Sequence, residues 1–148
     1  MNLLGVMEVS GSALQAERIR AEVVAANMAN AETTRTADGG PYRRQEVVFS
    51  SEAPAGGFAS SLSSASGPTD PPIGGVQVSA VVTDSSSPLR RYDPGNPDAD
   101  KNGYVAYPNI NPMTEMVDLM GATRAYGLNS SAVQAEKSML SSALDILK

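Results

Sequence analysis

All ten prolines of this 148-residue chain lie between Pro41 and Pro112, so neither flank contains the residue that most strongly interrupts helices. Both flanks also repeat apolar residues at alternating spacings of three and four, which places these residues on one side of a helix. We therefore predict an α+β chain with a long helix at each end and a small antiparallel β-rich middle. Two long helices around so short a middle are expected to pack together as a coiled coil or against further copies of the chain.

The predicted organisation has three parts. Residues 1–36 form an N-terminal helix and turn, residues 37–110 a β-rich middle domain, and residues 111–148 a C-terminal helix. Residues 51–75 are mostly Gly, Ser, Ala and Pro, which predicts a long flexible loop inside the middle domain. Alternating apolar residues predict strands at 42–49, 76–82, 89–92 and 104–107, and six of the seven aromatic residues lie in this middle part, where we expect a compact core.

The apolar stripes of the two predicted helices indicate surfaces for contact between subunits. The heptad-like spacing of the last helix favours coiled-coil packing. A helix from residue 112 to the end would be on the order of 50 Å long, which is too long for a domain this small to cover by itself. The predicted interface residues are Leu4, Met7, Leu14, Ala21, Ala25, Met28, Met116, Leu119, Tyr126, Val133, Leu140, Leu144 and Leu147.

Composition excludes several classes of chemistry. The chain has no cysteine and no histidine, which excludes thiol nucleophiles, zinc sites built on these ligands and histidine acid–base catalysis. We predict no cofactor and no metal. The net charge of −5 argues against a nucleic-acid partner, and we interpret the basic pairs Arg43-Arg44 and Arg90-Arg91 as solvent-exposed.

The chain shows no membrane-targeting pattern. No segment approaches the roughly 18 apolar residues of a membrane span, and the N-terminus lacks the basic region of a cleaved signal peptide. If the protein leaves the cytoplasm, we expect it to use a route without a cleaved leader.

Acidic residues cluster in one turn-rich segment. The segment 98–103 matches the first half of a calcium-binding EF-hand loop, but the twelfth position, which needs a glutamate, is Asn109. We interpret it as an acidic turn. Asp93-Pro94-Gly95 predicts a type II turn with positive φ at the glycine. A small hydrolase or calcium-dependent enzyme using Asp93, Asp98 and Asp100 stays open as an alternative, which a calcium titration would decide.

Two segments carry helix-boundary signals. Asn111-Pro112 predicts the N-cap and first residue of the last helix, with Glu115 and Asp118 placed to suit the helix dipole. The first helix is expected to stop at the asparagines Asn27 and Asn30, and Asn30 is expected to adopt the left-handed conformation.

This second boundary carries a resemblance to a known family. The segment containing Asn27, Ala29, Asn30, Ala31 and Thr33 resembles the Asn-Leu-Ala-Asn-Ala signature of the bacterial flagellar rod and hook protein family. The block Asp93-Pro94-Gly95-Asn96-Pro97 and the segment 109–120 are similar to its proximal-rod members. The resemblance covers nearly the whole chain in order and departs from it at residues 51–75.

The resemblance implies a structural subunit of the flagellar basal-body rod and not an enzyme. It implies helical stacking with copies of itself and with other rod proteins into a hollow drive shaft that crosses the periplasm and transmits torque to the hook. It also implies export by the flagellar type III apparatus. The alternatives are a rod subunit at another axial level and a small coiled-coil adaptor that forms a closed dimer, which analytical ultracentrifugation would reveal.

Overall fold

The computed structural model describes residues 3–37, 39–51 and 74–146. Two long helices and four strands occur among these residues. In chain order they are α1 (Leu3–Ala29), β1 (Gln45–Ser51), β2 (Val76–Thr83), β3 (Leu89–Tyr92), β4 (Tyr104–Tyr107) and α3 (Pro112–Ile146).

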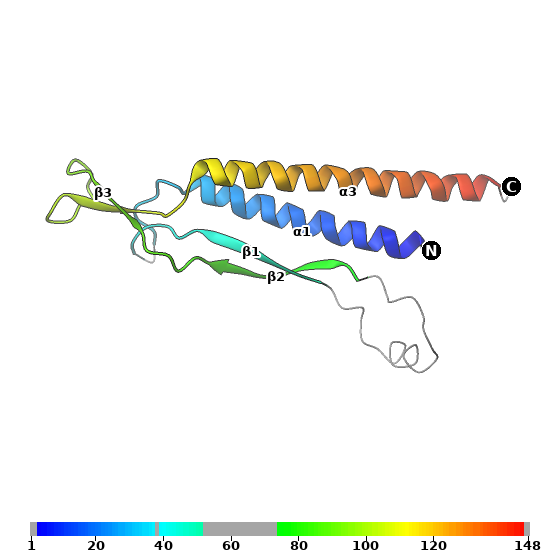
Figure 1. Cartoon of the computed structure of the whole chain (residues 1–148), viewed down its shortest axis with the longest axis horizontal. Coiled ribbons are helices and arrows are strands. Elements are labelled where there is room, and N and C mark those ends of the chain that lie inside the picture. The colour runs from blue at the N-terminus through cyan, green and yellow to red at the C-terminus, as the bar shows by residue number, and fades with distance from the viewer. Residues whose placement is uncertain (1–2, 38, 52–73, 147–148) are drawn as a thin grey trace, which may run out of the picture.

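The two helices lie side by side and run in opposite directions. Figure 1 shows both chain ends at one end of the molecule, the β1–β2 hairpin along the side of α1 away from α3, and β3–β4 at the opposite end. The α+β class is confirmed, and so is the expectation that the two ends of the chain pack together. No helix among the described residues combines the length and the apolar character that crossing a bilayer requires.

The predicted boundary signals of α3 are confirmed. The Asn111 side-chain oxygen accepts a hydrogen bond from the Met113 N–H at 3.0 Å, so Asn111 is the N-cap and Pro112 is the first helical residue. Helix α1 runs from Leu3 to Ala29, close to the predicted bounds.

The strands form two separate two-stranded antiparallel sheets. In the first, Gln45 pairs with Thr83 and Ser51 pairs with Val76, with an irregularity at Val48/Phe49. Strand β1 begins later than predicted because the chain before it is held to the turn after α1, where the Tyr42 N–H donates to the Thr33 carbonyl at 3.0 Å.

The expectation of a compact aromatic core in the middle of the chain is wrong. Tyr92 is 64% exposed and Tyr104 is 44% exposed, because a two-stranded sheet without a covering layer leaves a face in solvent. Half of the buried apolar residues lie on the helices, and the other half lie on β4 and just after it; they are Ala16, Val24 and Ala122, and Val105, Tyr107 and Ile110. Most of the predicted loop at 51–75 lies outside the described residues.

Candidate functional site

A buried asparagine joins three elements of the fold. Asn27, near the end of α1, is fully buried. Its amide nitrogen donates to the Gln45 carbonyl at 2.8 Å and to Glu115 Oε2 at 3.0 Å. Its oxygen accepts from the Gln45 N–H at 2.9 Å and from the Tyr42 hydroxyl at 3.2 Å. The amide therefore uses its two donors and both lone pairs to hold α1, the start of β1 and α3 together.

A charged pair completes this site. Arg44 Nε donates to Glu115 Oε1 at 2.6 Å, and the Glu115 side chain is only 1% exposed. Both oxygens of Glu115 are thus occupied, one by Asn27 and one by Arg44, as a buried carboxylate requires. This hydrogen bond to Glu115 raises the pKa of Arg44, and burial together with the Glu115 charge raises the pKa of Tyr42. We call Asn27, Tyr42, Arg44, Gln45 and Glu115 the helix junction.

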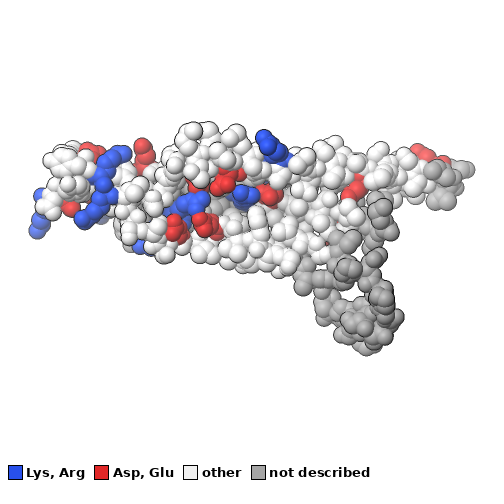
Figure 2. All heavy atoms as spheres, in the orientation of Figure 1, with Lys and Arg blue, Asp and Glu red and all other residues white. Residues whose placement is uncertain are grey.

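Further ion pairs extend the helix junction along the helices. Arg20 on α1 contacts Asp118 on α3 at 3.2 Å, and the Asp118 carboxylate also lies 3.8 Å from Arg44. Figure 2 shows charged side chains gathered in this region and around β3–β4, while most of the visible helical surface toward the chain ends is uncharged. Charge is therefore concentrated where elements from distant parts of the sequence meet.

Sequence reasoning missed most of the helix junction. Arg44 was expected to be solvent-exposed, which is wrong because Glu115 and Asp118 draw its guanidinium between the helices and β1. Glu115 was interpreted only as a complement to the helix dipole. Asn27 was identified through the motif, but as part of a stop signal. Arg44 and Glu115 are 71 positions apart in the sequence. No local sequence pattern indicates that these two side chains form a pair.

Asn30 ends helix α1 through its side chain. No non-glycine residue in the described part of the chain has a positive φ, so the left-handed conformation predicted for Asn30 is wrong. Its amide nitrogen donates to the Ala26 carbonyl at 2.9 Å, and its oxygen accepts from the Thr33 hydroxyl at 3.1 Å. The Ala26 carbonyl also accepts from the Asn30 backbone N–H at 3.1 Å, and the Thr33 N–H donates to the Asn30 carbonyl at 3.0 Å. The chain therefore leaves the helix through these bonds without a left-handed residue.

The loop between β3 and β4 is organised by short-range bonds. Asp100 Oδ1 accepts from the N–H groups of Asn102 at 2.7 Å and Tyr104 at 3.0 Å, and these bonds lower the pKa of Asp100. The positive φ of this loop occurs at Gly103, at 79°, and not at Gly95. The type II turn predicted at Gly95 is therefore wrong, because the chain reverses through a bond from the Asn96 N–H to the Asp93 carbonyl that needs no left-handed residue.

The two motif segments meet in space. The Thr34 hydroxyl, just after the first motif, donates to Asp98 Oδ2 at 2.8 Å. The Tyr107 hydroxyl donates to Asp93 Oδ2 at 3.3 Å and accepts from the Asn96 amide at 3.4 Å. The carboxylates that an acidic active site would use are thus engaged in holding the loop. Within the described residues no group of three or more acidic, histidine or cysteine side chains could hold a metal ion.

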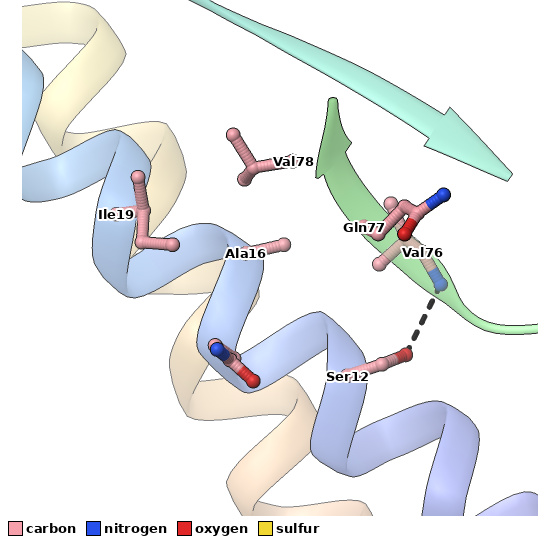
Figure 3. Close-up of a pocket in the computed structure, with 7 residues that line it drawn as sticks. Ser12, Ala16, Ile19, Val76, Gln77 and Val78 are labelled. Atoms are coloured by element: carbon pink, nitrogen blue, oxygen red, sulfur yellow. Dashed lines mark hydrogen bonds between the residues drawn. The ribbon is translucent and has the colours of Figure 1, made fainter. Parts of the chain in front are cut away.

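A hollow of about 340 Å³ lies between α1 and β2 (Figure 3). One hydrogen bond crosses it, from the Val76 N–H to the Ser12 hydroxyl at 3.1 Å. Its described lining offers aliphatic and amide groups and no titratable side chain; it consists of Ser12, Gln15, Ala16, Ile19, Val76, Gln77 and Val78. The hollow therefore resembles a gap between packed elements more than a site for catalysis.

Of the eleven predicted interface positions whose side chains the structure describes, six are exposed and five are half-buried. On α1, Met7 and Ala25 are exposed while Leu14, Ala21 and Met28 are half-buried. On α3 the exposed positions are Met116, Tyr126, Leu140 and Leu144, and the half-buried ones are Leu119 and Val133. Leu4 and Leu147 fall outside the residues whose side chains the structure describes. Contact between subunits through these residues stays a prediction.

Comparison with known proteins gives one consistent answer. Residues 7–35 match the family described as "Flagella basal body rod protein", and residues 101–146 match "Flagellar basal body rod FlgEFG protein C-terminal". The chain is 41% identical to the flagellar basal-body rod protein FlgC of Borreliella burgdorferi, with 100% of this chain and 99% of the relative covered.

Two further relatives have the same name. FlgC of Bacillus subtilis is 42% identical over 96% of both chains. FlgC of Salmonella typhimurium is 39% identical over 95% of this chain and 94% of its own length. The chain therefore belongs to the FlgC family and is a structural subunit of the flagellar basal-body rod, not an enzyme.

Proposed function

We propose that this chain stacks helically with copies of itself and with other rod proteins to form the proximal part of a hollow drive shaft. In this arrangement the helical ends, residues 1–36 and 111–148, form the rod core, and residues 37–110 form the middle domain. The shaft crosses the periplasm, transmits torque from motor to hook, and receives its subunits from the flagellar type III export apparatus.

The observation that carries this proposal is the amount of exposed apolar surface along α3. Large exposed hydrophobic residues follow the helix from its first turn to its last: Met113, Met116, Val117, Met120, Tyr126, Leu128, Met139, Leu140 and Leu144. Apolar surface of this extent marks a contact site for other proteins. The heptad-like spacing within it favours coiled-coil packing between neighbouring subunits.

The helix junction suits a part that carries load. Torque passes through a subunit only if its helices and hairpin move as one body. Asn27 and Glu115 tie α1, β1 and α3 through buried hydrogen bonds, which keep these elements in a fixed relation.

The test replaces Leu144 by proline in cells that lack the wild-type chain. Proline inside a helix costs roughly 3 kcal/mol or more, and residue 144 is far along α3 from the helix junction, so the fold around the junction should persist. We expect the variant to be made, to be missing from purified basal bodies, and to leave cells non-motile. Leu144→Met is the matched control, because it conserves volume and should assemble normally.

Each alternative predicts a different result. If Leu144→Pro assembles and supports motility, this end of α3 does not contact other subunits. A discrete closed dimer in analytical ultracentrifugation, with no tagged chain in purified basal bodies, would favour the adaptor alternative. A tagged chain found at the distal end of the rod would place the subunit at another axial level.

A further inference from the structure

Three methionines lie close together on the surface of α3. Met113, Met116 and Met120 are 69%, 46% and 54% exposed. At about 100° per residue they fall within about 60° of one another around the helix, and each lies about 100° or more from Glu115. Because Glu115 is buried in the helix junction, the three methionines face away from it. We call Met113, Met116 and Met120 the methionine stripe.

The thioether sulfur of methionine is the group of this chain that oxidants attack most readily. The chain contains no cysteine, no tryptophan and no histidine, but it contains seven methionines. A peroxide transfers one oxygen atom to the sulfur, which loses two electrons and becomes a sulfoxide. The O–O bond of hydrogen peroxide breaks, and its second oxygen leaves with both protons as water. The reaction needs no neighbouring catalytic group, so the exposure of each sulfur determines where it occurs.

Oxidation changes the character of the surface around the methionine stripe. Val117 and Leu128 are 61% and 67% exposed, and they lie on the same side of α3 as the stripe. A sulfoxide is polar, whereas the thioether is apolar and flexible. Three sulfoxides within two turns would therefore make the start of this apolar surface polar, and the surface would lose its tendency to be buried against another protein.

We propose that the methionine stripe is a reversible oxidation site that controls whether a free subunit can enter the rod. In the reduced chain the stripe is apolar and can be buried, whereas in the oxidised chain it is polar and keeps its water. Enzymes that reduce methionine sulfoxide restore the first state. The modification itself is independent of the proposed function, and its effect on assembly rests on that function.

The other methionines provide the comparison within the chain. Met7 and Met139 are 41% and 54% exposed, but neither has another methionine within four residues along the chain. A sulfoxide at either position changes a single residue and leaves the apolar surface around the stripe intact. Met28 is half-buried on α1 and should react more slowly than the exposed methionines.

Peptide mapping of the purified full-length chain tests the modification. The chain is exposed to dilute hydrogen peroxide for increasing times, digested and analysed by mass spectrometry. We expect each residue of the methionine stripe to gain one oxygen atom, about 16 Da, before Met28 does. The methionine sulfoxide reductases MsrA and MsrB with dithiothreitol should return the stripe to its original mass. Equal rates at Met28 and at the stripe would overturn the inference.

Leucine variants in cells test the effect on assembly. Replacing Met113, Met116 and Met120 together by leucine removes the reactive sulfurs and conserves volume and apolar character. Met7→Leu combined with Met139→Leu is the matched control. Each tagged chain is made as the only copy in cells without methionine sulfoxide reductases and grown with sublethal hydrogen peroxide. We expect peroxide to lower the number of tagged basal bodies per cell for the wild-type chain and for the control, but not for the stripe variant.

Three outcomes would overturn the inference. Equal loss of basal bodies in the wild-type chain and the stripe variant would show that peroxide acts elsewhere. Protection by the control variant equal to that of the stripe variant would show that the stripe is not the sensitive site. Undiminished assembly of a wild-type chain whose stripe is oxidised would show that the sulfoxides are tolerated.

Two further results are distinguished from these. If the triple leucine variant does not assemble without peroxide, Met113→Leu, Met116→Leu and Met120→Leu are compared singly, and the inference is overturned if none of them reduces the loss. Absence of the tagged wild-type chain from basal bodies without peroxide would contradict the proposed function instead, while the peptide mapping would still decide whether the stripe is oxidised first.

Discussion

The helix junction and the turn around Asp100 in the β3–β4 loop are both built from polar side chains, but they bridge very different lengths of chain. In the junction, Asn27 bonds Tyr42, which is 15 residues away, and Glu115, which is 88 residues away. In the loop, Asp100 bonds Asn102 and Tyr104, which are two and four residues away. The junction therefore determines how the helices and β1 are arranged, whereas the bonds of Asp100 determine only the shape of the loop. Substitutions in the two regions should differ in how much stability they remove and in how far from the substituted residue the structure changes.

The largest expected effect is that of Asn27→Ala. The substitution leaves the half-buried Gln45 backbone groups and one buried Glu115 oxygen without a partner, and we expect a loss of about 3 kcal/mol in the free energy of unfolding. Urea unfolding of the purified chain measures this loss. Asn27→Asp should fail in the same way, because its carboxylate cannot donate to the Gln45 carbonyl and would face Glu115.

Asn129→Ala is the matched control for Asn27. The Asn129 amide makes one local bond, to the Ala125 carbonyl at 2.9 Å, and its loss should cost about 1 kcal/mol or less. Equal losses for the two alanine variants would mean that the helix junction does not hold the elements together.

Gly103→Ala should destabilise the loop by about 1–2 kcal/mol. The φ of Gly103 is 79°, and an added Cβ would lie 2.8 Å from Tyr92 Cε2. Gly121→Ala in α3 is the contrasting variant, because a Cβ there meets nothing within 4 Å, and alanine should add about 1 kcal/mol of helix stability. Urea midpoints that move in the same direction for both variants would contradict this assignment.

Substitution of Asn30 should separate side-chain capping from backbone conformation. Because the Asn30 amide bonds Ala26 and Thr33 and φ is negative, Asn30→Ala and Asn30→Gly should each lose about 1 kcal/mol of stability. Stability and motility of the two variants provide the measurement. Full recovery by glycine alone would restore the left-handed interpretation.

The smallest effects should appear at the two extremes of pH. The folded-state pKa of Tyr42 is raised above its usual 10.0, so the stability it contributes is present below pH 10 and is lost as pH rises through the raised pKa. The pKa of Asp100 is lowered below 3.8, so its contribution is present above pH 3.8 and is lost as pH falls through the lowered pKa. The junction should thus weaken in alkali and the loop in acid.

Unfolding free energies measured across pH test this contrast. Tyr42→Phe should flatten the alkaline side of the profile and Asp100→Asn the acid side. Tyr126→Phe is the control for the alkaline side, since Tyr126 is exposed and lies outside the helix junction. If the decrease of the unfolding free energy at alkaline pH is the same in Tyr42→Phe as in the wild-type chain, the helix junction does not stabilise the neutral form of Tyr42.

Features that depend on neighbouring residues could be predicted from the sequence. The proline-free apolar repeats predicted both helices, and Asn111-Pro112 predicted the start of α3. Alternating apolar residues predicted four strands close to their observed bounds. The motif around Asn27 and Asn30 also led to the correct family. Each of these signals is carried by residues within a few positions of one another.

Features that depend on distant residues could not be predicted. The partners of Arg44 and Glu115 are fixed by the antiparallel helix pair and by where β1 begins, and no local pattern encodes either. The predictions of a left-handed backbone at Asn30 and Gly95 were wrong for a related reason. Asparagine and glycine permit a left-handed backbone, but hydrogen bonds in the folded chain provided another way to turn at both positions.

Asn27 and Glu115 are 88 residues apart in the sequence, so Asn27 is synthesised well before its partner. At synthesis rates of 5–20 residues per second, Asn27 waits for about 4 to 18 seconds before its partner on α3 has been made. Closing so long a loop is among the slow steps of folding, because its entropy must be overcome before any contact is gained. The bond network of the helix junction therefore cannot form until the first turn of α3 has been made, and until then α1 and β1 lack the partner that joins them to the other end of the chain.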